Sequence, residues 1–251
     1  MREFRHYILT PFNLHLYGER REAQLANARL TPDEWMDHRL ELFGTYTLPS
    51  IAGQSCKDFT WLVMLDENTS PRHRKILDAM QFPNLRLCYR NTETGNTSVI
   101  SEFEKGDYDL ITTRIDNDDA FQRGFVQSVQ ECYRRKAERD KPWAIILPYG
   151  YILDANSGQM FFMEHPANNC PTMVEDSQTP KTIWSIKHIQ IPQTLPTEYT
   201  CEKPSWVMIV HGQNISNQMI YGGTIKVHYD KPLPLSLLAD FNIHLQSVPK
   251  F

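Results

Sequence analysis

The stretch Leu110–Phe121, LITTRIDNDDAF, carries an apolar, β-branched run directly into three acidic residues. These are Asp116, Asp118 and Asp119, and only Asn117 separates them. The run predicts a buried strand that ends at about residue 115. Clustered carboxylates repel one another and are rarely buried without a partner. The stretch therefore predicts a strand that delivers acidic side chains to a place where positive charge is expected.

The spacing of the acids favours a cation site. Asp116 and Asp118 project to the same side of an extended chain, and paired carboxylates suit Mg²⁺ or Mn²⁺. A cation held by few protein ligands keeps open positions for diphosphate oxygens. Asp119 with Gln122 matches a capping box, which predicts a cap for the next helix. The alternative is an exposed acidic turn that caps a helix and binds nothing.

Two further apolar runs are each followed directly by a polar residue that could bind a ligand. Phe59–Leu65, FTWLVML, predicts a strand buried on both faces, and it stops at Asp66. In open α/β sheets, ligands bind at the carboxyl ends of the strands, so Asp66 is expected on that edge, as a partner for a pyrimidine ring N–H or as a turn residue. Trp206–Val210 is followed by His211, which is a competent Mn²⁺ ligand or a structural histidine.

The rest of the chain alternates strand and helix signals, which predicts an α/β fold in one domain. His165–Pro204 is rich in proline and polar residues and is expected to be irregular, as a functional loop or lid. Leu233–Leu245 is expected to be a packing helix, with membrane-surface or dimer contact as the alternative. The remaining predicted elements are strands at His6–Leu14, Leu85–Tyr89 and Trp143–Leu147, a hairpin of Tyr151–Leu153 with Met160–Met163, and helices from Thr31 to Gly53, Pro71 to Met80, Thr97 to Phe103 and Phe121 to Arg139.

Composition narrows the class of protein. The net charge of the 251 residues is -4, which argues against a nucleic-acid-binding protein. The five cysteines are scattered and form no CxxC pair, which fits reduced thiols in a cytoplasmic protein. No run approaches the roughly 20 apolar residues of a membrane span, although peripheral membrane contact stays open. Composition does not fix the oligomeric state.

An ordered set of segments resembles the GT-A class of nucleotide-sugar glycosyltransferases and, more narrowly, a bacterial family of rhamnosyltransferases. The segments are HYILTPFNLHLY, HRLELFGTYTLPSIAGQ, FTWLVMLDENTSP, TTRIDNDDAF, NNCPTMVE and WVMIVHGQNISN. The resemblance implies a single GT-A domain over residues 1–251, with a nucleotide-binding half at 1–120 and an acceptor-binding half at 121–251. It implies a mostly parallel central sheet flanked by helices, with an irregular C-terminal acceptor region.

The implied activity is transfer of a sugar, rhamnose first, to a hydroxyl of a glycan or glycolipid in polysaccharide biosynthesis. The donor is dTDP-rhamnose or a UDP- or GDP-sugar, Mn²⁺ or Mg²⁺ is the cofactor, and inversion is expected. Asp116 and Asp118 correspond to the Asp-x-Asp pair, with Asp118 as the direct ligand. His211 falls where a late histidine meets the metal or the diphosphate.

The resemblance also assigns nucleoside contacts and a general base. Asp66 matches the acid that meets the base, while Pro11 stands where a basic residue is expected in relatives. Inverting transfer needs a general base, and Glu175 or the adjacent Asp176 matches it, with His188 as a further candidate and a solvated loop as the alternative. The residues of the first strand that are expected at the nucleoside are Thr10, Phe12 and Asn13.

Three more residues are candidate donor contacts. Arg90 and Arg114 suit diphosphate oxygens, although Arg114 could instead pair with Asp116. Asn214 could bind sugar or phosphate oxygens, or simply form a turn. Two other functions stay open: a non-catalytic module that binds carbohydrate or nucleotide-sugar, and a sugar nucleotidyltransferase. The second is disfavoured because YILTPFNLHLYG lacks a glycine-rich, basic phosphate loop.

Overall fold

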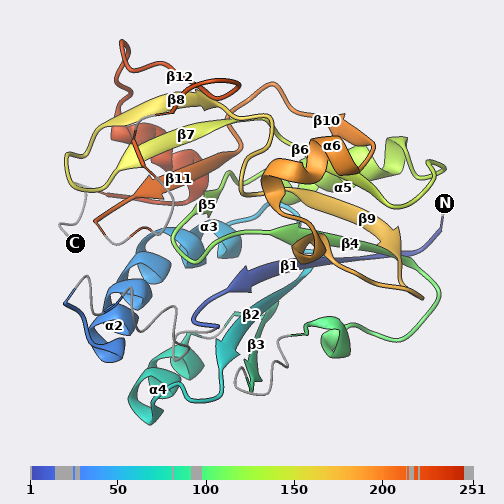
Figure 1. Ribbon diagram of the computed structural model, residues 1–251, viewed down its shortest axis with the longest axis horizontal. Coiled ribbons are helices and arrows are strands. Elements are labelled where there is room, and N and C mark those ends of the chain that lie inside the picture. The colour runs from blue at the N-terminus through green and yellow to red at the C-terminus, as the bar shows by residue number, and fades with distance from the viewer. Residues whose placement is uncertain are drawn as a thin grey trace.

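The computed structural model describes residues 2–14, 25, 29–80, 82–91, 98–212, 214, 218–219 and 221–245. Within these ranges, a seven-stranded central sheet has the order β10-β6-β9-β4-β1-β2-β3 (Figure 1). Its strands are β1 (Phe4–Pro11), β2 (Thr60–Asp66), β3 (Leu85–Arg90), β4 (Asp109–Arg114), β6 (Trp143–Ile146), β9 (Thr172–Asp176) and β10 (Thr197–Tyr199). The strands β4, β1, β2 and β3 are parallel, whereas β9 is antiparallel to both of its neighbours. The predicted α/β class with a mostly parallel central sheet is confirmed.

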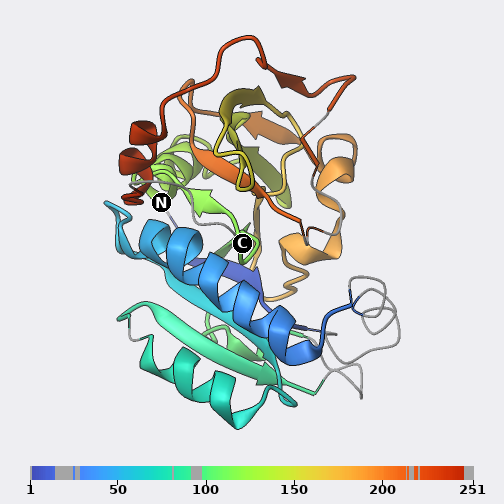
Figure 2. The ribbon, with the colours of Figure 1, turned by 90° about the vertical axis from the view of Figure 1, so that its left-hand side faces the viewer.

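A second sheet, of five strands among the described residues, has the order β12-β8-β7-β11-β5. Figure 2 shows it above helix α2, with strands β2 and β3 below that helix. Strands β7 and β8 are antiparallel, so the predicted hairpin is confirmed. The strands are β5 (Ala120–Phe121), β7 (Tyr149–Asp154), β8 (Met160–Glu164), β11 (Trp206–Val210) and β12 (Lys226–Val227).

Strand β7 needs a glycine where it meets the first residue of β11. A Cβ atom at Gly150 would lie 2.2 Å from the Trp206 ring. The ring cannot simply move away, because its Nε1 donates to the Leu147 carbonyl at 2.8 Å and the side chain is buried. This close approach fixes the start of β11, whose other end leads into His211.

The helix predicted to start at Thr31 has the predicted capping box. The Thr31 hydroxyl accepts from the Glu34 N–H, and the Glu34 carboxylate accepts from the Thr31 N–H. The helix α2 (Pro32–Leu42) continues through a π-helical turn, η1 (Phe43–Thr47), into α3 (Leu48–Ala52). It ends before Gly53, as predicted. The ring of Phe43 contacts both Phe12 and Trp61, so the turn anchors the helix to the end of β1 and to the start of β2.

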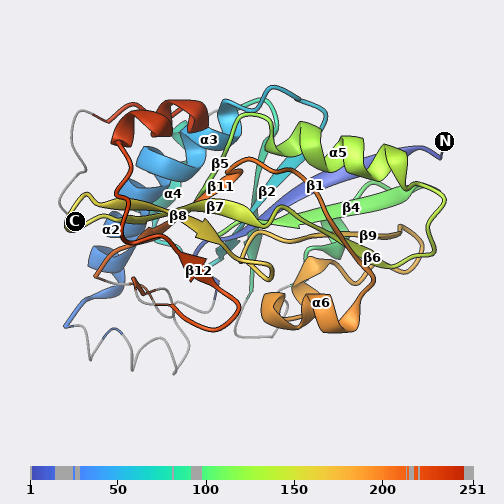
Figure 3. The same cartoon turned by 90° about the horizontal axis from the view of Figure 1, so that it is seen from above.

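The other α-helices cover both sides of the strands. Figure 3 shows α3 and α5 on one side and α6 on the opposite side. The C-terminal packing segment is a 3₁₀ helix, Leu235–Phe241, with Leu238 and Phe241 buried. None of the described helices is long and apolar enough to cross a membrane. The remaining bounds are α4 (Pro71–Ala79), α5 (Phe125–Arg135), α6 (Ile191–Thr194), and 3₁₀ turns at Ile100–Glu102, Ile183–Ser185 and His188–Gln190.

Three sequence predictions differ from the structure. The stretch 165–204 is not irregular throughout, because it supplies β9 and β10 to the central sheet. The helix expected from Phe121 begins at Phe125 instead, since Ala120–Phe121 is the strand β5, which pairs with β11. The segment expected to be helical at 97–103 forms only the 3₁₀ turn Ile100–Glu102, and residue 97 lies outside the described residues.

Candidate active site

The carboxyl ends of β1, β2 and β4 meet, as the sequence predicted. Asn13, after β1, accepts the Asp66 N–H through Oδ1 at 3.0 Å and donates to Thr69 Oγ1 at 2.9 Å. Asn117, after β4, donates to the Phe12 carbonyl at 2.9 Å. Thr10 faces inward, where its hydroxyl accepts from Trp61 Nε1 at 2.9 Å. These side-chain bonds hold the predicted nucleoside residues on one edge of the sheet.

Asp118 lies at the centre of this edge and is buried. Its Oδ2 accepts from the Arg39 guanidinium at 2.6 Å and lies 3.0 Å from His211 Nε2. The Asn214 amide is 3.4 Å from the same oxygen. Burial disfavours the charged carboxylate, but Arg39 and His211 outweigh it and lower the pKa of Asp118 to about 2. The positive charge expected beside the clustered acids is thus supplied by Arg39.

His38 and Arg39, which are adjacent on α2, contact His211 and Asp118 respectively. Arg39 reaches Asp118, and it also donates to Asn117 Oδ1 at 3.1 Å. His38 Nε2 lies 3.1 Å from His211 Nδ1. Burial, followed by the neighbouring charges of His211 and Arg39, lowers the pKa of His38 to about 4. His211 follows β11 of the second sheet rather than a central strand, so one helix and both sheets converge here.

Asp116 does not join Asp118 and His211. Its carboxylate accepts from the Arg114 guanidinium at 3.0, 3.1 and 3.2 Å. This pairing raises the pKa of Arg114. Among the described residues, no group of three or more His, Cys, Asp or Glu side chains could hold a metal ion. The predicted three-ligand site is therefore not assembled, because Arg114 holds the first of its acids.

Asp119 is not the helix cap that its spacing predicted. It is fully buried, and its carboxylate accepts from the Ile209 N–H at 3.0 Å and from the Asn169 amide. Burial, followed by the charges of Asp118 and Asp116, raises its pKa well above the usual range. The residue therefore ties the acidic loop to β11, and the cap of α5 is Gly124.

Glu175 and Asp176 lie far from Asp118. Because β9 runs antiparallel to β4, Glu175 is opposite Leu110 and Asp176 is opposite Asp109, at the start of β4. At a rise of about 3.3 Å per residue, that is roughly 20 Å from Asp116. Glu175 accepts the N–H groups of residues 181 and 182 at 2.8 Å each, and Asp176 pairs with Arg2 at 3.1 Å. The structure therefore places these two acids at the opposite end of β4 from Asp118 and does not bring them together with it.

His188 lies on the carboxyl edge instead. The Pro171 carbonyl accepts the Arg114 N–H at 3.0 Å, which brings the segment before β9 to the end of β4. His188 Nδ1 is 2.8 Å from the Ala167 carbonyl in that segment, and its ring lies 6.3 Å from that of His165. Burial lowers the pKa of His188. The third candidate base is thus the one that reaches this edge.

The Arg90 guanidinium contacts protein groups of β3 and of the segment 98–102. It pairs with Glu102 and donates to the carbonyls of Ser98 at 3.0 Å and Tyr89 at 2.9 Å. It therefore holds the segment 98–102 against β3. The Glu102 carboxylate thus balances the positive charge of Arg90, which the sequence analysis expected beside a diphosphate.

Asp118 and His211 form the pair that best fits a divalent cation. Two neighbouring ligands of an octahedral ion with bonds near 2.1 Å are about 3.0 Å apart. Asp118 Oδ2 and His211 Nε2 have this separation, 3.0 Å, and carboxylate with imidazole suits Mn²⁺. Arg39 shares the same oxygen, so a cation here would lie beside its guanidinium. The fit is to a two-ligand protein site, without Asp116.

Sequence reasoning missed His38, Arg39 and Asn169. Arg39 carried a usable signal, because it lies three residues after Met36 and four before Phe43, on the face that the helix buries. A cation on a buried helix face needs an acid, and the acids of the opening stretch were the obvious partners. His38 and Asn169 carried no comparable signal.

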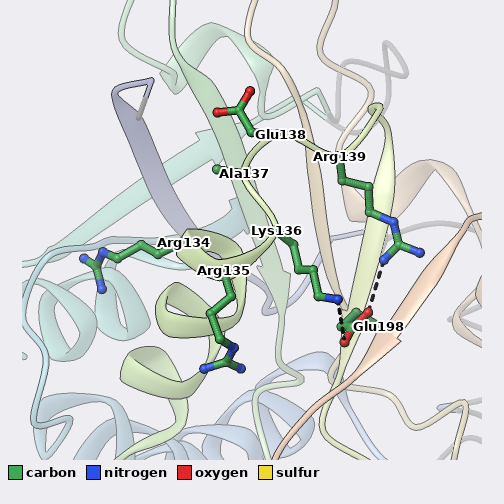
Figure 4. Close-up of a pocket in the computed structure, with 7 residues that line it drawn as sticks. All are labelled: Arg134, Arg135, Lys136, Ala137, Glu138, Arg139 and Glu198. Atoms are coloured by element: carbon green, nitrogen blue, oxygen red, sulfur yellow. Dashed lines mark hydrogen bonds and ion pairs between the residues drawn. The ribbon is translucent and has the colours of Figure 1, made fainter.

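A separate basic pocket lies at the C-terminal end of α5 (Figure 4). Glu198 pairs there with Lys136 at 3.7 Å and with Arg139 at 3.4 Å, while Arg134 and Arg135 point away from it. Basic residues in the last turn suit the negative end of a helix dipole. This interaction with the end of α5 accounts for the basic residues that line the pocket.

Comparisons with known proteins identify the family of the chain. No curated protein matches it in sequence. Two crystal structures of S. aureus TarS 1-349, one of them in complex with UDP, match at 10% identity with TM-scores of 0.45 and 0.47, and cover 82% and 83% of this chain. The chain spans 60% of the length of each of these TarS structures. The inositol-1-phosphate CTP transferase from T. maritima matches at 10% identity with a TM-score of 0.37, over 86% of this chain and 94% of that one. Residues 9–223 match the model of the family described as "Putative rhamnosyl transferase", so the chain belongs to that family.

Proposed function

We propose that this protein is a glycosyltransferase that moves a sugar from a nucleotide diphosphate sugar to an acceptor hydroxyl of a glycan or glycolipid. Family membership supports the reaction class. The observation that carries the proposal is the buried cluster of Asp118, Arg39 and His211 at the carboxyl ends of parallel strands, where α/β folds bind nucleotides. Rhamnose from dTDP-rhamnose is the first donor to test, followed by UDP- and GDP-sugars.

Asp118 and His211 would hold the divalent cation, Mn²⁺ or Mg²⁺. Such an ion, when bound, neutralises charge that develops on the departing diphosphate. The guanidinium of Arg39 adds a fixed positive charge at the same carboxylate, 2.6 Å from Oδ2. The Asn214 amide donates to the Ile209 carbonyl and to Asp118, and its oxygen accepts the His211 N–H, so this residue would hold the two ligands beside each other.

The nucleoside would lie over the ends of β1 and β2. Asp66 is buried there, and its Oδ1 accepts the Asn68 N–H at 2.8 Å. Asn13 links this turn to β1 through Thr69, so the groups that would meet the base are held rigidly. Rigid polar groups at a strand end give the orientation on which nucleotide recognition depends.

His188 is our proposed general base for an inverting transfer. A proton on Nδ1, directed at the Ala167 carbonyl, leaves Nε2 as the basic nitrogen. Burial lowers the pKa of the ring, which favours the neutral form that a general base requires. Arg114, Asp116 and His165 are the charged or titratable neighbours of the ring.

A thermal-stability screen with UDP, dTDP and GDP, each with and without Mn²⁺, tests the donor and the cation. We expect one nucleotide to raise the melting temperature, and chelation to abolish most of that rise. An equal rise with and without metal would refute the cation site. A protein that binds nucleotide-sugar but never transfers or hydrolyses it would instead be a binding module, and Asp118→Ala is the variant that links binding to turnover.

A further inference from the structure

We propose that the segment 183–191, IWSIKHIQI, contacts an anionic lipid surface and brings a lipid-linked acceptor to His188. The inference rests on the proposed function, because it names the class of acceptor that the proposed base would meet. In this contact Ile189 would enter the apolar boundary of the membrane, while Lys181 and Lys187 would meet negatively charged headgroups.

Three isoleucines of this segment, spaced three residues apart, run from the core to the surface. Ile183 is 1% exposed, Ile186 is partly buried, and Ile189 is 56% exposed. Among the large hydrophobic side chains of the described residues, Ile189 has the highest exposed fraction. Single exposed apolar residues are ordinary on protein surfaces. Here Trp184 and Ile186 are also only partly buried, so the exposed apolar surface of the segment extends beyond one side chain.

The segment is fixed at both of its ends. Ile183 and Ile191 are buried in the same apolar cluster, and the Ile183 N–H donates to the Thr112 hydroxyl at 3.0 Å. Thr182, directly before the segment, has φ 67° and ψ 161°, a conformation that is almost restricted to glycine. Such strain persists only where surrounding contacts impose it, and it is concentrated at functional sites. The fold therefore keeps this apolar segment at the surface at a cost in backbone strain.

The charge of the segment and its flanks is positive. Residues 177–197 contain Lys181 and Lys187, which are both exposed, and no aspartate or glutamate. The acids that flank this stretch, Asp176 and Glu198, each pair with an arginine. Glu175 lies near Lys181, but its carboxylate is buried and accepts two backbone N–H groups. Exposed lysines beside an exposed isoleucine suit an anionic membrane interface, whereas a neutral soluble glycan would gain nothing from the two positive charges.

The same segment carries the proposed general base. His188 lies between Lys187 and Ile189, and the contact of its Nδ1 with the Ala167 carbonyl, at 2.8 Å, holds the ring at the carboxyl edge. The helix α6, which directly follows the segment, lies on the side of the strands opposite α3 and α5 (Figure 3). A lipid surface could thus approach the segment without meeting those helices. An acceptor hydroxyl in the headgroup layer would then lie at the level of His188.

Flotation with lipid vesicles tests this contact without donor or cation. One set of vesicles contains phosphatidylglycerol with phosphatidylcholine, and the other contains phosphatidylcholine alone. We expect the wild type to float with the anionic vesicles at low salt, and Ile189→Gln and Lys187→Gln each to weaken binding about fivefold. The control is Ile100→Gln, at an isoleucine that is 42% exposed, and it should bind as the wild type does. All three substitutions are at exposed positions, so the melting temperature should not change.

Three results of the flotation would overturn the inference: no binding of the wild type to anionic vesicles, equally strong binding to neutral vesicles, or equal losses in Ile189→Gln and Ile100→Gln. Transfer from a labelled nucleotide-sugar separates this inference from the proposed function. Faster transfer to a soluble oligosaccharide than to vesicles of bacterial lipid extract would refute the lipid-linked acceptor and leave the transferase proposal intact. Vesicle binding without any transfer or hydrolysis would refute the transferase proposal and leave the lipid contact.

Discussion

Arg39 and Asp118 form a buried ion pair, with 2.6 Å between the guanidinium and Oδ2 and each side chain 6% exposed. The pair joins the buried face of α2 to the loop that follows β4. Burying two charges is costly, and the cost is met only while both remain. The strength of the site and the stability of the fold are therefore linked at this contact.

Arg39→Met should lower the free energy of unfolding by about 3–5 kcal/mol, because it leaves the Asp118 carboxylate buried without its main counter-charge. Urea unfolding followed by circular dichroism measures the change. The control is Arg72→Met, whose pair with Asp37 has side chains 59% and 45% exposed. That variant should change stability by about 0–1 kcal/mol. Equal effects of the two variants would contradict the buried pair.

The pKa of Asp118 predicts how stability depends on pH in the cation-free protein. Its folded-state pKa of about 2 lies below the ordinary value of 3.8, so its stabilisation is present above about pH 4 and is lost as the pH falls through 2. The loss should be about 2 kcal/mol. The measurement is the difference in unfolding free energy between wild type and Asp118→Asn, with chelator, from pH 6 to pH 2. A difference that stays constant over this range would refute the depressed pKa.

Glu175→Gln should affect stability rather than catalysis. The carboxylate accepts two backbone N–H groups at 2.8 Å, and an amide offers only one oxygen for them. We expect a loss of about 1–3 kcal/mol in unfolding free energy, with kcat within about threefold of wild type. A fall in kcat of a hundredfold at unchanged stability would restore Glu175 as the base.

His188→Ala should lower kcat by about 10²–10⁴-fold and leave the Kd for the donor unchanged, because the general base acts on the acceptor. Added imidazole should restore part of the turnover, which a purely structural histidine would not allow. His165→Ala is the matched control, at the neighbouring ring. Loss of donor binding in His188→Ala would assign the residue to the donor site instead.

Gly150→Ala should destabilise the second sheet, because its Cβ would meet the fixed Trp206 ring at 2.2 Å. Overpacking of this kind costs about 1–3 kcal/mol. Gly222→Ala is the control, since no atom lies within 4 Å of its Cβ position. A melting temperature equal to that of the control would show that the ring can move.

The sequence predicted the parts of the fold that local signals determine. The Thr31–Glu34 capping box and the apolar runs of β2 and β4 each depend on a few neighbouring residues. The parallel edge followed from those runs, and it correctly placed Asp66 beside the end of β1. Such elements are predictable because propensity, pattern and tertiary packing agree.

The errors arose where a distant strand decided the outcome. Asp119 matched a capping box, but pairing of Ala120–Phe121 with β11 kept the chain extended, and the Ile209 N–H took the carboxylate. Thr172–Asp176 is a short run with little alternation, and only its two neighbours make it a central strand. No local pattern reveals that this strand is antiparallel to β4. Because it is antiparallel, Glu175 lies near the start of β4, far from Asp118. The roles of Arg39 and His38 depend on contacts across the fold in the same way.

Asp118 follows β4 of the central sheet and His211 follows β11 of the second sheet, and this arrangement has a consequence for local opening. A ligand bound by both side chains would connect the two sheets, so neither sheet could open locally at this point without releasing the ligand. Amide hydrogen exchange in β4 and in β11 should then slow together when the ligand binds, even though the two strands are not hydrogen-bonded neighbours.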